Sequence, residues 1–138
     1  MTAREYLEQY KEADKIAKRL KAEYEKELLL IDTIKSASDI DGMPHGNGIN
    51  KTVEDKAIWL ADKAAIWKMA ELDALRLRQE VFELVHDIPG DEGDILCARY
   101  VNLLKWADVC KAVHLSWESV RKHHRIALSM VTEKLSTK

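Results

Sequence analysis

The first forty residues constrain the fold most, because they form an amphipathic stretch with no glycine or proline before Gly42. Thr2 and Glu5 fit a capping box, which predicts that a helix begins at the start of the chain. Apolar side chains then recur every three or four residues: Tyr6, Tyr10, Ala13, Ala17, Leu20, Tyr24, Leu28, Ile31 and Ile34. This spacing places them on one helix face. A helix of roughly 35 residues is about 50 Å long and needs a partner to cover that face.

A second long helix is expected after a loop at residues 36–50, which hold three of the five glycines and one of the two prolines. Asn50 or Thr52 could cap this helix, which runs to about His86. One apolar stripe on it consists of Val53, Ala57, Leu60, Ala64 and Trp67. An adjoining stripe consists of Ile58, Ala61, Ala65, Met69, Leu72, Leu75 and Phe82. Two stripes predict more than one neighbour. The two helices together predict an antiparallel hairpin that acts as a scaffold or forms a dimer.

Shorter helices are expected after Pro89 and Gly90. Asp91–Tyr100 and Trp106–Val113 read as two of them, and Ser116 is a strong N-cap for a last helix. The inward side of the last helix is expected to carry Val120, His123, Ala127, Leu128 and Val131. No strand-like alternation occurs, so the predicted fold class is all-α. We expect a hairpin at 1–88, for oligomerisation or partner binding, and a DNA-binding module at 89–138.

The segment 105–131 carries the functional signal. It reads as a short helix, a three-residue turn and a capped second helix, the pattern of a helix-turn-helix. Its expected small core is Trp106, Val109, Leu115, Val120, Ala127 and Leu128. In such modules the second helix enters the DNA major groove. The residues expected to contact DNA are Ser116, Trp117, Glu118, Ser119, Arg121, Lys122 and Arg125.

The net positive charge of the C-terminal segment indicates that its partner is anionic. The whole chain has a formal net charge of −2. From Lys105 onward, seven basic and three acidic side chains give a net charge of +4. A polyanion such as DNA would therefore meet the C-terminal third.

The motifs of this segment resemble region 4 of sigma-seventy-type factors. The run Trp106–Arg121 is similar to the hydrophobic-x-x-Ile-Ala segment, turn and Ser-x-x-x-Val-Arg of that region, and Ala127-Leu128 to its Ala-Leu pair. Ile95-Leu96-x-x-Arg99-Tyr100 is similar to its Leu-x-x-Arg-Tyr helix. His114 stands where the turn usually has a glycine, a position that often needs a positive φ.

The whole chain resembles still more closely the small phage proteins of the ArpU/RinA type, which join such a module to a long helical hairpin. Their Met-Pro-x-Gly loop is similar to Met43-Pro44-x-Gly46-x-Gly48. The resemblance covers nearly all 138 residues, with its specific motifs at 43–48 and 95–128. It implies a phage or prophage transcriptional regulator that binds double-stranded DNA and touches host RNA polymerase.

Several alternatives stay open at this point. Trp117 could pack on a thymine methyl or sugar edge, bind a protein partner, or cover the end of the domain core. Glu118 could complement the helix dipole or read cytosine. The chain could also be a helical adaptor that binds RNA polymerase or another protein without touching DNA, or a DNA-packaging subunit.

The residues do not suggest catalysis, a metal or a cofactor. His123 and His124 project about 100° apart on a helix, so we expect one half-buried ring and one exposed ring. Cys97 and Cys110 lack CxxC spacing and are expected to be reduced core residues. No Ser-His-Asp or Cys-His arrangement stands out, so the chain is not expected to be an enzyme. Without a signal segment or an apolar run long enough to span a membrane, a cytoplasmic location is expected.

Overall fold

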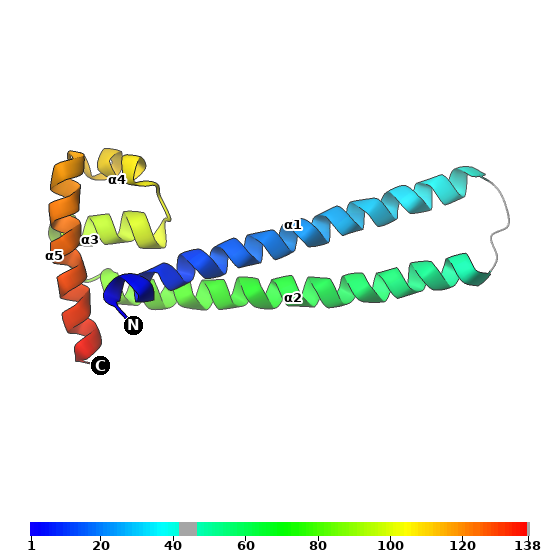
Figure 1. The fold of residues 1–138 in the computed structure, drawn as a ribbon, viewed down its shortest axis with the longest axis horizontal. Coiled ribbons are helices and arrows are strands. Elements are labelled where there is room, and N and C mark those ends of the chain that lie inside the picture. The colour runs from blue at the N-terminus through cyan, green and yellow to red at the C-terminus, as the bar shows by residue number, and fades with distance from the viewer. Residues whose placement is uncertain (42–46, 138) are drawn as a thin grey trace. The chain divides into compact units, whose positions relative to one another are not determined.

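The computed structural model describes the backbone of residues 1–41 and 47–137 and the side chains of residues 1–33 and 54–137. This part of the chain is all-α and contains no strand, which confirms the predicted fold class (Figure 1). It forms two long helices followed by a group of shorter ones. The elements are α1 (Ala3–Asp41), α2 (Asn47–Val85), α3 (Gly90–Leu96), the π-helical turn η1 (Cys97–Val101), α4 (Trp106–Val113) and α5 (Trp117–Ser136).

The predicted capping box at the start of α1 is present. The backbone N–H of Glu5 donates to Thr2 Oγ1 at 3.2 Å, and the backbone N–H of Thr2 donates to Glu5 Oε2 at 3.0 Å. Each side chain thus satisfies a backbone donor of the first turn that has no partner inside the helix. The start of α1 is therefore fixed by its own sequence.

The predicted loop at 36–50 was wrong in its bounds. Helix α1 continues to Asp41 and α2 begins at Asn47, so Asn50 and Thr52 lie inside α2 and do not begin it. Residues 36–41 contain no glycine or proline that would stop a helix, and a single glycine within a helix costs only about 1 kcal/mol. Met43, Pro44 and Gly46 of the loop motif lie outside the described residues.

The contacts divide the chain into two compact units. Unit 1 contains residues 1–13 and 73–138, and unit 2 contains residues 14–72. The first turns of α1 and the last turns of α2 therefore belong to the same unit as α3, α4 and α5. The predicted functional division at residue 88 stays a prediction, because a border between contacts is not a border between functions.

Unit 1 has two hydrophobic clusters. The first joins the start of α1 and the end of α2 to α3, η1 and α5. Its buried members are Ala3, Leu7, Val81, Leu84, Val85, Ile88, Leu96, Tyr100, Val101, Ala127 and Val131. The second joins α3, η1, α4 and α5 through Ile95, Ala98, Val109 and Val120. The small core expected for 105–131 is thus split. Its Val109 and Val120 lie in the second cluster, whereas its Ala127 lies in the first.

Helix α5 spans both clusters because it is 20 residues long. The inward positions predicted for it are confirmed for Val120, Ala127 and Val131, which are fully buried. Leu128 is half-buried and packs against the first cluster. His123 is also only half-buried, because its ring reaches a carboxylate instead of the core.

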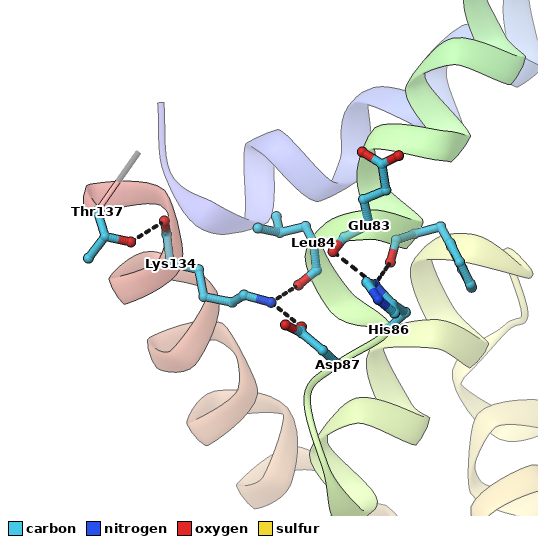
Figure 2. Close-up of polar contacts among 7 residues, drawn as sticks. Glu83, Leu84, His86, Asp87, Lys134 and Thr137 are labelled. Carbon is cyan, nitrogen blue, oxygen red and sulfur yellow. Dashed lines mark hydrogen bonds and ion pairs between the residues drawn. The ribbon is translucent and has the colours of Figure 1, made fainter.

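The end of α5 is tied to the end of α2 (Figure 2). Lys134 Nζ donates to the backbone carbonyl of Leu84 at 2.6 Å and forms an ion pair with Asp87. The hydrogen bond from Lys134 holds the pKa of the Asp87 carboxyl below its usual value. The Leu84 carbonyl lies in the last turn of α2, where carbonyls lack partners within the helix. His86 Nδ1 lies within 3.0 Å of another carbonyl of that turn, of Glu83. These side chains cap α2 and fix the C-terminal half of α5 on it.

In unit 2, α1 and α2 run antiparallel (Figure 1). The Tyr24 and Trp67 rings lie 6.2 Å apart between their centroids, and Lys21 Nζ lies 5.4 Å from the Trp67 ring centroid. The first stripe predicted on α2 includes Leu60, which is buried. The second stripe is open: its Ile58, Met69 and Leu72 are 63%, 60% and 61% exposed.

Among the described residues, none of the helices combines the length and the hydropathy that a membrane span requires.

Candidate nucleic-acid interface

A tight turn joins α4 to α5, as the sequence predicts. Helix α4 ends at Val113, and His114 follows in the left-handed region with φ 58° and ψ 40°. The backbone N–H of Leu115 donates to the Cys110 carbonyl at 3.1 Å, which closes the end of α4. Ser116 is extended and caps α5, since Ser116 Oγ accepts from the backbone N–H of Ser119 at 3.3 Å. The positive φ expected at His114 and the N-cap expected at Ser116 are both confirmed.

The angle between α4 and α5 is fixed by side chains that are buried between them and α3. Val109 of α4 and Val120 of α5 are both fully buried against Ile95 of α3. Because protein interiors are close-packed, α4 and α5 cannot change their crossing without disturbing α3. The outer face of α5 is therefore presented by a rigid support.

Arg99 positions the first residue of α4, a role that the sequence did not reveal. The η1 turn, closed by a 3.0 Å bond from the Asn102 N–H to the Cys97 carbonyl, brings Arg99 beneath α4. Its Nη1 donates to the Leu104 carbonyl at 2.8 Å, and its guanidinium lies 4.5 Å from the Trp106 ring centroid. A cation over an indole face is attractive, so Arg99 holds the Trp106 ring in place.

The predicted contact residues are gathered on the outer face of α5. Trp117, Glu118, Arg121, Lys122 and Arg125 are exposed, as is the cap Ser116. Ser119 is half-buried, because it lies over its own cap bond. Glu118 lies in the first turn of the helix, where a carboxylate complements the helix dipole.

No carboxylate with a described side chain neutralises the cations on this face. Among the residues whose side chains the structure describes, Arg121, Lys122 and Arg125 form no ion pair with any carboxylate. By contrast, Arg4, Lys18 and Arg76 on the long helices each pair with a carboxylate four residues away on the same helix. The face of α5 thus keeps a positive charge available to an anionic partner.

A pocket of about 230 Å³ opens on the same face. Helix α5 lines it with side chains three or four residues apart, α4 adds one residue and α1 adds another. The lining residues are Trp117, Arg121, His124, Arg125 and Leu128 from α5, Trp106 from α4 and Arg4 from α1. Helical spacing from Arg121 could have singled out His124, but no pattern in the sequence places Arg4 beside them.

Two tryptophans form the aromatic wall of this pocket. Trp117 meets Trp106 edge to face, with 5.5 Å between ring centroids and 62° between planes. Trp117 nevertheless stays 46% exposed, so it covers part of Trp106 and leaves much of its own ring open. Such a ring offers a flat apolar surface to a sugar, a base edge or a protein side chain.

His124 forms the floor of the pocket and is held by an aromatic cluster. Its Nε2 lies 2.7 Å from Tyr100 Oη, its ring stacks on Tyr100, and it meets the Trp106 ring at 4.8 Å between centroids. Burial lowers the pKa of His124, and the charges of Arg4 and Arg99 lower it further, whereas Glu8 opposes them. Burial also raises the pKa of Tyr100 to about 12. At neutral pH the positive charge of the pocket therefore comes from its arginines.

The expectation of one exposed histidine ring was wrong. Both His123 and His124 are half-buried, because each has found a partner on a different element. His123 Nδ1 lies 2.8 Å from Glu92 Oε1 of α3, and this hydrogen bond lowers the pKa of Glu92. In the part of the chain with described side chains, no three His, Cys, Asp or Glu residues are grouped to hold a metal ion. Cys97 and Cys110 are unpaired and half-buried, and burial raises the pKa of Cys97.

The chemistry of this face suits a phosphate backbone. Guanidinium groups present planar pairs of N–H donors that match phosphate oxygens, and indole rings pack against sugars and bases. Comparison of the chain with protein-family models, with curated proteins and with solved structures finds no match.

Proposed function

We propose that this protein binds double-stranded DNA as a phage or prophage transcriptional regulator, with α4 and α5 acting as a helix-turn-helix. One observation carries the proposal. The exposed cations Arg121, Lys122 and Arg125 stand without ion pairs among the described residues, on a Ser116-capped helix that follows α4 through a tight turn. A rigid helix with a free cationic face is what the major groove admits.

Each exposed residue of α5 has a distinct role in the proposed complex. Arg121, Lys122 and Arg125 contact phosphates or the acceptor edge of guanine. Ser116 and Ser119 hold the first turn, so that its N-terminal side chains meet base edges. Trp117 packs on a thymine methyl or a sugar, and Glu118 complements the helix dipole with cytosine as its base partner.

The proposal also includes self-association through the hairpin. A single module of this kind buries only about 600–1,000 Å² on DNA, so useful specificity needs a second copy or a contact with host RNA polymerase. The open stripe that includes Ile58, Met69 and Leu72 on α2 supports association at unit 2. Light scattering at micromolar concentration tests this part, and a strictly monomeric mass contradicts it.

Duplex binding under a salt titration tests the main proposal. We expect wild-type protein to bind promoter fragments with an affinity that falls steeply with salt. Arg121→Ala and Lys122→Ala should each lower the salt slope by about 0.9 where the side chain contacts a phosphate. If Arg121 reads a guanine instead, its loss should cost about 1–3 kcal/mol and relax specificity at that base.

The matched control is Lys26→Ala, which removes an exposed cation from α1 in unit 2. It should leave both the affinity and the salt slope unchanged, and helix content by circular dichroism should be equal in all variants. Affinity that does not respond to salt overturns the proposal. Capture of RNA polymerase without any duplex shift favours the adaptor, and a ring-sized assembly favours the packaging subunit.

A further inference from the structure

The pocket on α5 includes one side chain from outside the proposed helix-turn-helix. Arg4 is the second residue of α1 and lies more than a hundred positions before α5 in the chain. It nevertheless lines the same pocket as Arg121 and Arg125. All three arginines belong to unit 1. The start of α1 is thus part of the surface that α5 presents.

The backbone at Arg4 is well fixed. Ala3 and Leu7, which flank it on the helix, are both buried in the first hydrophobic cluster, with Leu7 fully buried. The capping box of Thr2 and Glu5 holds the same turn. Arg4 therefore projects from a rigid helix end, and little backbone entropy would be lost when it binds a ligand.

The guanidinium of Arg4 retains binding capacity. Its ion pair with Glu8 joins Nε to Oε1 at 3.1 Å, and the Arg4 side chain stays 61% exposed. An exposed pair of this kind contributes little stability, so exchanging it for another anion costs little. A phosphodiester in the pocket would offer oxygens to several guanidinium forks at once.

From this arrangement we infer that the pocket seats a phosphate of the DNA backbone, held between Arg4 of α1 and Arg121 and Arg125 of α5. The inference rests on the proposed function and deepens it. Trp106, Trp117 and Leu128 would pack against the adjoining sugar. Arg4 lies on a helix that does not enter the groove, so it adds affinity and carries no sequence information.

The salt slope of duplex binding tests the inference, with Arg4→Ala compared with Lys11→Ala. Lys11 is the matched control, because it is another exposed cation on the part of α1 that belongs to unit 1 but is absent from the pocket. We expect Arg4→Ala to lower the salt slope by about 0.9. The ratio of the wild-type affinity to the variant affinity should then fall by about 3.5-fold for each fourfold rise in salt. The preference for specific over random duplex should not change. Lys11→Ala should behave as wild type.

Duplexes with single neutral methylphosphonate linkages locate the contact. The neutral linkage at one position should weaken binding by the wild-type protein but have no effect on binding by Arg4→Ala. By the logic of a double-mutant cycle, the phosphate replaced at that position is the one that Arg4 contacts. Inorganic phosphate serves as a second probe: if it displaces duplex at constant ionic strength only when Arg4 is present, the pocket is a general phosphate site.

The outcomes separate the inference from the function on which it rests. A slope unchanged by Arg4→Ala but lowered by Arg121→Ala overturns the role of Arg4 and leaves duplex binding by α5 in place. Failure of the wild-type protein to bind duplex overturns both. Arg4→Lys checks that charge is the cause, since it should restore the slope while losing the bidentate geometry.

Discussion

Unit 1 and unit 2 are both built from helices with apolar stripes, but they bury those stripes to different extents. Among the described side chains (residues 1–33 and 54–137), the nine largest that are fully buried all lie in unit 1: Leu7, Leu84, Ile95, Leu96, Val81, Val85, Val109, Val120 and Val131. Among the side chains of unit 2 that the structure describes, the buried apolar residues are Ala17, Ile31 and Leu60, each still 7–8% exposed. Two helices meet along one seam only, whereas a core needs elements around it. The difference shows that the ends of the long helices gain their burial from α3, η1 and α5.

This contrast bears on the proposed roles. A close-packed support holds the cationic face of α5 in one geometry, which groove recognition needs. The open stripe of unit 2 leaves an apolar surface for association, since contiguous exposed apolar surface commonly marks an interaction site.

The largest effect is expected for Leu96→Ala compared with Leu60→Ala. Leu96 is fully buried between α3 and its neighbours in unit 1, so its truncation should lower the free energy of unfolding by about 2–5 kcal/mol. Leu60 is 8% exposed and lies on a two-helix seam that can collapse around a smaller side chain. Its truncation should cost clearly less. Urea denaturation measures both values.

Amide hydrogen exchange provides the control for this comparison. Leu96→Ala should increase exchange throughout unit 1, and Leu60→Ala should increase it near Leu60 alone. If Leu60→Ala costs as much as Leu96→Ala, unit 2 has a core as tight as that of unit 1. The contrast would then fail.

The sequence predicted those features that depend on neighbours along the chain. Three examples are the capping box of Thr2 and Glu5, the bounds of Trp106–Val113 and the Ser116 cap. Each is set by side chains within a turn or two of the backbone that they control. Periodicity likewise identified the two stripes of α2, because it depends only on residue spacing.

Features that depend on distant segments were not predictable in this way. Spacing alone does not say which stripe of α2 faces α1, nor that His123 would meet Glu92 across 31 residues. The π-helical turn and the positive φ of Leu103 arise where η1 gives way to α4, with no glycine to signal them. Arg4 joins the pocket only because the first turn of α1 lies beside α5 in unit 1.

A smaller effect is expected for His114→Gly. His114 holds a φ of 58°, which strains any residue with a Cβ, and glycine relieves that strain while making the unfolded chain more flexible. We expect a net gain of up to about 1 kcal/mol in the free energy of unfolding. The matched control is Ala112→Gly, two residues earlier inside α4, which should cost about 0.5–1 kcal/mol.

Opposite signs for these neighbouring substitutions would show that the turn of unit 1 holds the left-handed geometry in solution. A loss of stability in His114→Gly as large as that in Ala112→Gly would contradict it. Both values come from the same urea titrations.

The smallest effect is the pH dependence that His124 confers on unit 1. Burial and the charges of Arg4 and Arg99 lower the pKa of His124 below its ordinary 6.5, against the weaker opposing charge of Glu8. Between the folded pKa and 6.5 the unfolded chain binds a proton that the folded chain does not. The stability is therefore complete above pH 6.5 and declines as the pH falls below that value. The hydrogen bond between Glu92 and His123 affects stability at lower pH. Its contribution to the free energy of unfolding is complete above about pH 4.5 and is lost as the pH falls through the lowered pKa of Glu92.

Urea denaturation between pH 7.5 and 5.5 covers the window of His124 and lies above that of Glu92. We expect His124→Gln, which keeps a hydrogen-bonding partner for Tyr100 Oη but does not titrate, to lose less stability than wild type over this interval. Equal slopes for the two proteins would mean that the imidazole is solvated in both states and that the pocket floor is looser than its contacts indicate. A shallower slope in the variant would show instead that the packing of unit 1 extends up to the cationic face of α5, so that the surface proposed to meet DNA is supported by the same core that Leu96 helps to form.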